Sequence, residues 1–544
     1  MHTSSRIVGV AVVATLLAVS VAMPSANATI PPFRDAGTVA AGRSTAAVRE
    51  DAFDLTVRDA RDYASTQLLS TLQTVRPGAY TYVTGSSGQW GTAGPTNWSA
   101  GYYPGALWMR YEDTASEGWR VAAGRRQAPL ADSATQSGDI DTGVRYYPSF
   151  VNGYRLTGDL AQRDVALKAA SAVDRRFDVG LGMIRSRDTI GGFQVVVDEL
   201  MNLQLLFWGA RNGGPGTWRE HATTHALNAA KWFVRPDGTT YHLIEFDEAT
   251  RGVKQYLAGQ GAAPDSTWSR GQAWAIYGFT VAYRETWDPR FLKTARAVAD
   301  SYLASLPPDA VPYWDFEAPG IPAEPRDSSA AAIAASALVD LATQDPDATN
   351  RARYAERARA IMSSLASAYL SRGTQTASIL AHGTYDRPNG SSDTGLAWGD
   401  YFFLEAMLRL RLLPATTAPL RIVRASESGH NGRSAAARAI DGRLDTCWAA
   451  RGRMQWLQFD LGGQKHIGKV AIATYSGRSR SATYTFLASS DGAKWWPLSA
   501  ALTSGRWGDF ETFDVPDASA RYLRLVCGGT TVNELNGVYE VRIY

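Results

Sequence analysis

Two patterns of apolar positions divide the chain. From about residue 50 to residue 412, apolar residues recur three and four positions apart, which predicts amphipathic helices. This periodicity permits a double ring of paired helices as well as a solenoid of helical hairpins, although no motif repeats at a fixed period, which disfavours a repeat protein. The predicted helical stretches are 51–75, 104–115, 117–130, 141–157, 160–176, 196–211, 219–234, 268–286, 288–306, 327–344, 350–371 and 398–412.

The C-terminal part has a different pattern. Short segments rich in β-branched and aromatic residues, such as WLQFDLG, HIGKVAIATY, ATYTFLASS and ARYLRLVCG, alternate with turns, which predicts an all-β sandwich. The segment LLPATTAPL before them contains two prolines and two threonines and is typical of a linker. We therefore predict a helical domain over 47–412, a linker over 413–421 and a β domain over 422–544.

The N-terminus has the features of a secretory signal. Arg6 is followed by an apolar run from Ile7 to Met23 and by a small-x-small site ending at Ala28. Residues 1–28 are predicted to be a signal peptide, with an uncleaved anchor as the alternative, and the Pro-, Gly-, Ser- and Ala-rich residues 29–46 a flexible lead-in. With a composition rich in Ala and Arg, this indicates a secreted bacterial protein without membrane attachment after cleavage.

Composition limits the functional classes. A chain of 544 residues is too long for one ordinary core, which agrees with two domains. The net charge of +3 argues against a general partner such as nucleic acid or a membrane surface. The two cysteines, Cys447 and Cys527, are able to pair in an exported protein if their Cα atoms come close, and neither has a histidine nearby that would indicate catalysis.

Two aspartates are the strongest candidates for chemistry. Asp141 lies in GDIDTGVRYYPSF, and Asp198 lies in VVVDELMNLQLLFWGA. A carboxylate at the edge of a long apolar helix is costly unless it is solvated, paired or used. Desolvation beside the three valines would raise the pKa of Asp198. The structural alternative is that Asp198 is a buried cap and that Asp141, with Asp139, only caps a helix.

These aspartates belong to a longer series of motifs. STWSRGQAW, VPYWDFEAP and RDSSAAAIAAS follow them in order, and the whole series, from Trp98 to Arg411, resembles family 88 glycoside hydrolases, the unsaturated glucuronyl hydrolases. The resemblance implies an all-α (α/α)6 barrel whose loops form a cleft at one end. It also implies removal of a non-reducing-end Δ4,5-unsaturated uronic acid from lyase-made oligosaccharides by hydration of the C4=C5 bond, with no organic cofactor.

The resemblance assigns residues to roles. Asp198 matches the acid/base, and Asp141 matches the family's second aspartate. Arg270 is the candidate partner of the uronate carboxylate, because a guanidinium pairs with a carboxylate bidentately. The implied substrate-binding residues are His242, Gln260, Trp268, Arg270, Trp274 and Trp98. Ile140 and Arg187 stand where relatives often carry a histidine and an aromatic residue, so substrate preference is not transferred.

The β domain has a second resemblance. AIDGRLDTCWAA, ASSDGAKW and RYLRLVCGG resemble the discoidin or F5/8 type C domain, a jelly-roll sandwich also used as a family 32 carbohydrate-binding module. It implies a glycan ligand, for which the loop residues His430, Arg478, Arg480 and Trp507 are candidates, with Trp448 and Trp456 in the core. It also implies a structural Ca²⁺ held by Asp441, Asp445, Thr446 and Glu540, for which the alternative is a polar turn closed by hydrogen bonds.

The sequence alone leaves other functions open. The nearest enzyme alternative is the family 105 activity on unsaturated rhamnogalacturonyl ends, and an inverting hydrolase of saturated glycans is a further one. An alternative of another class is a surface adhesion protein with an inactive barrel, against which the intact Asp141 and Asp198 argue.

Overall fold

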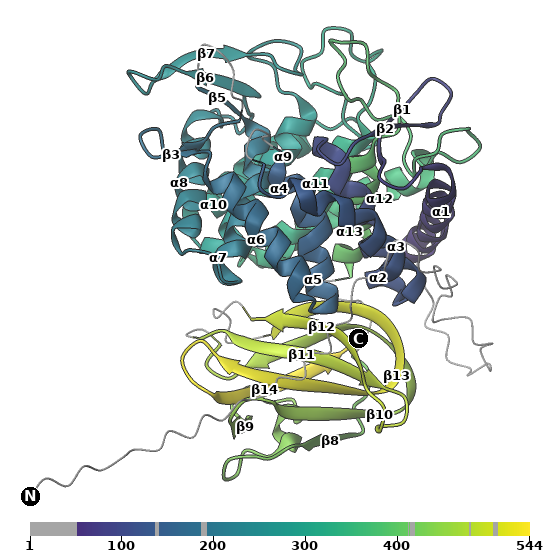
Figure 1. Ribbon diagram of the computed structural model, residues 1–544, viewed down its shortest axis with the longest axis vertical. Coiled ribbons are helices and arrows are strands. Elements are labelled where there is room, and N and C mark those ends of the chain that lie inside the picture. Colours follow the sequence, from purple (N-terminus) through teal and green to yellow (C-terminus); the bar gives the residue numbers. More distant parts are fainter. Residues whose placement is uncertain are drawn as a thin grey trace, which may run out of the picture.

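The structure is a computed structural model that describes residues 52–136, 141–186, 193–411, 413, 419–477, 480–503 and 510–544 (Figure 1). The predicted signal peptide and lead-in lie outside these residues, as do Asp139, Ile140, Arg187, Arg478 and Trp507. No helix in the described part is long and apolar enough to cross a bilayer.

The helical domain is a double ring of helices, as predicted. Successive inner helices contact one another until the last contacts the first. The outer helices pack on the inner ones, except that the first outer helix packs mainly on the last outer helix. The inner ring consists of α2 (Tyr102–Thr114), α4 (Thr142–Tyr146) with α5 (Asn152–Thr157), α7 (Leu203–Arg211), α9 (Ser269–Thr286), α11 (Ser328–Gln344) and α13 (Ala397–Leu410). The outer ring consists of α1 (Ala52–Thr74), α3 (Glu117–Gln127), α6 (Leu160–Asp174), α8 (Thr217–Trp232), α10 (Pro289–Ala304) and α12 (Ala348–Ala368).

The sequence of each helix explains its ring. α11, with the sequence SSAAAIAASALVDLATQ, is apolar around almost its whole circumference and is buried on nearly every side. Its outer partner α12 buries one stripe and exposes Arg353 and Glu356. Asp327 and Asp347 cap these two helices, because each side chain accepts hydrogen bonds from two backbone N–H groups of the first turn.

Two of the predicted helices are interrupted. The stretch predicted over 141–157 is α4, a π-helical turn η3 (Tyr147–Val151) and α5, and Pro148 lies at the start of η3. A proline supplies no backbone N–H, so regular α-helical bonding ends there. The stretch predicted over 196–211 begins with a 3-10 segment, η4 (Val197–Asn202), before α7.

Short sheets cover one end of the barrel (Figure 1). They pair β1 (Tyr80–Thr84) with β2 (Trp90–Ala93), β3 (Phe177–Asp178) with β4 (Met183–Ile184), and β5 (Phe193–Val196) with β6 (Leu243–Phe246) and β7 (Val253–Leu257). The helical periodicity contained no indication of these strands.

The C-terminal domain is an antiparallel seven-stranded sheet folded into two layers. Its strands are β8 (Arg424–Glu427), β9 (Trp448–Arg451), β10 (Gln455–Thr474), β11 (Ala482–Ser489), β12 (Trp496–Leu502), β13 (Phe510–Thr530) and β14 (Leu535–Ile543). The long strands β10 and β13 belong to both layers: residues 455–460 of β10 pair with β8 and the end of β13, and residues 470–474 pair with β14. Trp448 is fully buried between the layers, as predicted.

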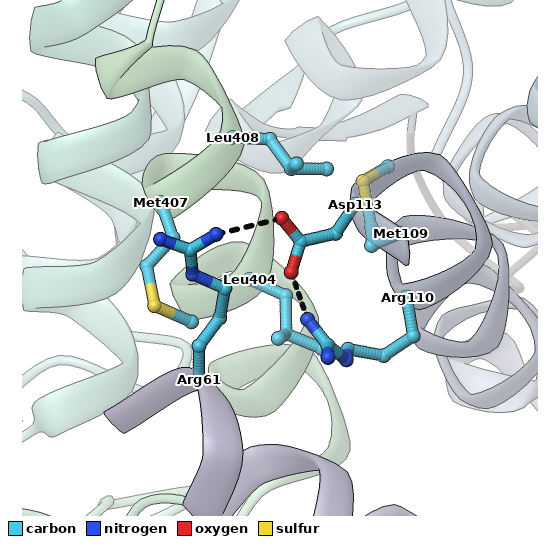
Figure 2. A pocket seen from close by; sticks show the side chains of 7 residues that line it. All are labelled: Arg61, Met109, Arg110, Asp113, Leu404, Met407 and Leu408. Atoms are coloured by element: carbon cyan, nitrogen blue, oxygen red, sulfur yellow. Dashed lines mark hydrogen bonds and ion pairs between the residues drawn. The ribbon is translucent and has the colours of Figure 1, made fainter. Parts of the chain in front are cut away.

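The two domains meet at the end of the barrel opposite the short sheets (Figure 1). Arg411, just after α13, pairs with Asp113 of α2 at 3.2 Å and with Asp517 of β13. Figure 2 shows Asp113 in a small cavity beside this junction, held also by Arg61 at 3.0 Å and by Arg110. Burial alone would raise the pKa of Asp113, but the three arginines outweigh it and lower the pKa. The cavity is lined by this buried cluster of charged side chains and lies away from the short sheets.

Candidate functional site

The predicted site residues lie where the inner helices begin. Because the six inner helices run in the same direction, their N-termini meet at the end covered by the short sheets. Near these N-termini lie Trp98 in η1 (Trp98–Gly101), Asp141 before α4, Asp198 in η4, Trp268 before α9, Asp327 before α11 and Trp398 in α13. The positive ends of the helix dipoles therefore point at this end, which favours an anionic ligand.

The two aspartate-bearing segments are joined by one asparagine. The Asn202 amide oxygen accepts a hydrogen bond of 2.5 Å from the backbone N–H of Gly143, and its amide nitrogen donates one of 2.6 Å to Glu199. A Cβ on residue 143 would lie 2.5 Å from the Asn202 Cα, so only glycine permits this approach of α4 to η4. The contact places Asp141, two residues before Gly143, on the same side of the barrel as Asp198.

The structure also bears on the capping alternative for Asp141. The residue occupies the N-cap position of α4, but its side chain makes no capping hydrogen bond. The N–H of Gly143, in the first turn, is taken by Asn202 instead. Capping is therefore not the role that the geometry gives to the Asp141 carboxylate.

Behind Asp198 lies a buried carboxyl that sequence reasoning missed. Glu199 is 1% exposed and accepts hydrogen bonds from the Ser186 hydroxyl at 2.9 Å and from Asn202. The Ser186 hydroxyl in turn accepts the N–H of Val196, so its hydrogen is directed at Glu199. Burial raises the pKa of Glu199 to about 8.

His242 faces Asp198 across the site. Its Nε2 lies 4.0 Å from Asp198 Oδ1, and the imidazole is 6% exposed while the Asp198 side chain is 23% exposed. Its Nδ1 lies 2.9 Å from the backbone nitrogen of Gln260 and 3.1 Å from the carbonyl oxygen of Ala258. Nδ1 thus lies beside one backbone donor and one backbone acceptor, so this loop holds the ring in place with either tautomer.

The loop after β7 holds this imidazole. Gly259 has φ +57° and lies so close that a Cβ there would be 2.4 Å from His242 Nδ1. On its other side the imidazole packs on the Trp268 ring, with 4.2 Å between ring centroids. The predicted residues His242, Gln260 and Trp268 are thus brought together beside Asp198.

Arg270 is engaged inside the protein. Its guanidinium is 2% exposed, pairs with the fully buried Asp327 at 2.7 Å and donates to the carbonyl of Tyr385 at 2.6 Å. Gln260 donates to the same Tyr385 carbonyl at 2.7 Å. Arg270 therefore fixes the loop that carries Tyr385, and its pairing with a uronate carboxylate stays a prediction with which Asp327 competes.

Aromatic side chains form one wall of the site. Trp98 packs on Trp398 with 4.5 Å between ring centroids, and its ring is nearly parallel to that of Tyr385 at 6.4 Å. Trp98 and Tyr385 are partly exposed, whereas Trp274 is 3% exposed and packs edge-on against Phe402 below the site. A sugar platform at Trp274 stays a prediction, and its burial disfavours it.

Tyr102 is a further residue that sequence reasoning missed. Its side chain is fully buried, and its hydroxyl has no hydrogen-bond partner among the described residues. Burial first, and then the charges of Asp141 and Asp198, raise the pKa of this hydroxyl well above its usual range. The hydroxyl therefore lies near both carboxylates. Only its position four residues after Trp98 in NWSAGYY could have indicated this.

Comparisons with known proteins agree with this arrangement. The unsaturated glucuronyl hydrolase of Formosa agariphila is 37% identical over 322 residues, which cover 58% of this chain and 80% of that relative. The chain belongs to the unsaturated glucuronyl hydrolases. These are glycoside hydrolases, so the intact aspartates belong to an enzyme and the adhesion and family 105 alternatives lose their support.

Two solved structures extend the comparison. An unsaturated glucuronyl hydrolase specific for heparin is 34% identical with a TM-score of 0.63, and the match covers 66% of this chain and 97% of that one. Another, with dGlcA-Glc-Rha-Glc, is 32% identical with a TM-score of 0.61, and the match covers 65% and 96%. The F5/8 type C domain model matches residues 422–541 of this hydrolase.

The turn predicted to hold calcium is closed by hydrogen bonds, as in the alternative of a polar turn, and calcium binding there stays a prediction. Asp441 accepts a hydrogen bond from the Thr446 hydroxyl at 2.6 Å, and Glu540 accepts the N–H of Gly442 at 3.1 Å, so these groups converge. Asp445 instead pairs with Arg443 at 2.7 Å. Within the described residues, no three His, Cys, Asp or Glu side chains gather as a metal site. Cys447 and Cys527 are both free thiols.

Proposed function

We propose that this hydrolase removes a Δ4,5-unsaturated uronic acid from the non-reducing end of oligosaccharides made by polysaccharide lyases. The observation that supports this most directly is the placement of Asp198 beside His242 Nε2, at 4.0 Å, in the segment that Asn202 joins to Asp141. An enzyme that hydrates a double bond needs one group that both gives and takes a proton, and a desolvated carboxyl does both.

The reaction follows from these groups. The Asp198 carboxyl gives its proton to C4 while a water attacks C5, and the carboxylate takes a proton from that water. The hydrated sugar is a hemiketal at C5, which opens to a ketone and releases the rest of the chain from C1. Only carboxyls and water take part, so we propose that catalysis needs no cofactor.

The remaining groups bind and orient the sugar. His242 Nε2 lies beside Asp198, where it can hydrogen-bond a sugar that is bound next to both side chains. The positive N-terminal ends of the inner helices favour the uronate carboxylate. The Trp98 and Tyr385 rings supply flat faces for the sugar rings.

The test is direct, because the unsaturated uronate absorbs in the ultraviolet and its hydrated product does not. Unsaturated disaccharides from chondroitin, hyaluronan, heparin and ulvan should be mixed with the full chain, and with its Asp198→Asn variant. A falling absorbance with the wild type and none with the variant supports the proposal. A flat signal on all four with folded protein, or full activity in the variant, contradicts it.

We also propose that the enzyme is secreted by a bacterium and that the C-terminal domain attaches it to a glycan. The F5/8 type C match over residues 422–541 supports the second point. We further propose a structural Ca²⁺ at the turn of Asp441, Thr446 and Glu540. Burial and the nearby Asp441 carboxylate raise the pKa of Glu540, so a cation there would relieve the repulsion of two converging carboxylates.

A further inference from the structure

The outer face of one sandwich layer carries aromatic and cationic side chains. Along a strand, alternate residues point to opposite faces, so the buried Leu457 and Leu523 point into the core while their neighbours point outward. The half-buried outward residues on β10 and β13 include Trp456, Gln458, Asp460, Tyr522 and Arg524, and Gln458 lies directly opposite Arg524. Trp456 was expected in the core; the alternation of this strand places it on the surface.

Arg524 is clamped between two indoles. Its guanidinium carbon lies 3.9 Å from the ring centroid of Trp495, which precedes β12, and 4.4 Å from that of Trp456. Its Nη2 donates to the Gln458 amide oxygen at 2.7 Å. Contact with both rings and with Gln458 restricts the guanidinium, so little side-chain entropy is left to lose when a ligand binds.

Among the described residues, no carboxylate pairs with this guanidinium. Its Nε has no hydrogen-bond partner in the described part of the chain, and burial is the single cause of a lowered pKa, with no neighbouring carboxylate opposing it. Arg521, on the same strand, differs: both Nε and Nη2 pair with Asp460 at 2.9 Å while it lies over Tyr522. Of the two arginines on β13, Arg521 is thus neutralised by Asp460, whereas Arg524 has no acidic partner among the described residues.

We propose that this surface, the clamp face (Trp456, Trp495, Tyr522 and Arg524), binds a carboxylate of a uronic-acid polysaccharide. A guanidinium edge matches a carboxylate with two parallel hydrogen bonds, and the aromatic side chains pack against pyranose rings. The inference rests on the proposed glycan binding of this domain. It places the binding site on the sheet face instead of on the loops at the ends of the strands. The ligand is the polymer whose lyase fragments the barrel would process.

The experiment uses the full chain in native gels that contain hyaluronan, polygalacturonate, dextran sulfate or neutral dextran. The wild type should be retarded by the two polyuronates and not by dextran. Arg524→Gln and Trp495→Ala should weaken the retardation about tenfold or more, because each removes a charge-assisted or stacking contact. Arg524→Lys should weaken it partly, since a point charge remains without the fork.

Arg521→Gln is the matched control. It removes an arginine from the same strand, but one already neutralised by Asp460, so it should bind polyuronates as the wild type does. Each variant should keep the wild-type melting temperature and the wild-type hydrolysis of an unsaturated disaccharide, because the clamp face lies in the other domain.

The outcomes separate the hypotheses. Unchanged polyuronate retardation in both Arg524→Gln and Trp495→Ala would overturn the clamp face while leaving glycan binding by the domain intact. Retardation by dextran sulfate alone would overturn the carboxylate assignment in favour of a sulfate ester. No retardation of the wild type by any polymer would contradict glycan binding itself, and disaccharide hydrolysis in the same samples would still test the barrel separately.

Discussion

Replacing Asn202 by leucine should displace Asp141 relative to Asp198 and so impair catalysis, although both aspartates are still present. Leucine has a similar volume but makes no hydrogen bond, so the N–H of Gly143 and the Oε1 of Glu199 lose the partners they have at 2.5 and 2.6 Å. A buried polar group left without a partner costs about 1–3 kcal/mol, so the two together lower the free energy of unfolding by about 2–6 kcal/mol.

The same change should reduce the catalytic rate. Asn202→Leu removes the side-chain hydrogen bond that joins η4 to the first turn of α4. A displacement of about 1 Å at a reacting centre typically lowers a rate about 10²-fold. We therefore expect kcat of Asn202→Leu on an unsaturated disaccharide to fall about 10²-fold. The assay is the loss of ultraviolet absorbance, measured well below the melting temperature of the variant, with urea unfolding of the same preparation.

Asn228→Leu is the control for stability alone. Asn228, on α8, donates to the carbonyls of Leu181 and Gly182 at 3.1 Å, so it also makes two hydrogen bonds between elements, but away from the aspartates. It should lose stability and keep kcat. If Asn202→Leu is destabilised as expected but keeps the wild-type kcat, Asn202 is only structural and the inference that it positions the aspartates is refuted.

Three other predictions follow from the site and the turn. The pKa of Glu199 is raised from 4.5 to about 8, so its contribution to stability is full below about pH 4.5 and is lost as the pH rises through about 8. In urea unfolding, Glu199→Gln should flatten this decline of the unfolding free energy with pH, and the same decline in the variant would contradict the raised pKa. Tyr102→Phe removes a buried hydroxyl that has no partner among the described residues, so the melting temperature should stay or rise. Because this hydroxyl interacts with the charges of Asp141 and Asp198, kcat/KM should fall, and an unchanged kcat/KM would show that it does not influence the two carboxylates. Ca²⁺ should raise the melting temperature of the wild type but not of Glu540→Gln, and equal shifts would place the ion elsewhere.

The local pattern of the sequence was enough to predict the helices. The stretch predicted over 327–344 is α11, Ser328–Gln344, and that over 268–286 is α9, Ser269–Thr286. Apolar spacing and capping residues act within one or two turns, so a linear pattern contains them. The change to short β-branched segments likewise predicted the sandwich, and the order of the motifs indicated Asp141, Asp198 and His242.

The tertiary structure alone decided which partners these residues have. Asn202 meets Gly143 across 59 positions, Gln260 meets Tyr385 across 125, and Arg270 is paired with Asp327 instead of exposed to a ligand. Each pairing depends on how helices that are far apart in sequence close into a ring. The surface position of Trp456 was decided in the same way, because which face of a strand is buried depends on the layer that packs against it. Local periodicity predicts whether a segment is a helix or a strand, whereas the contacts that form the site are made between elements that are far apart in the sequence.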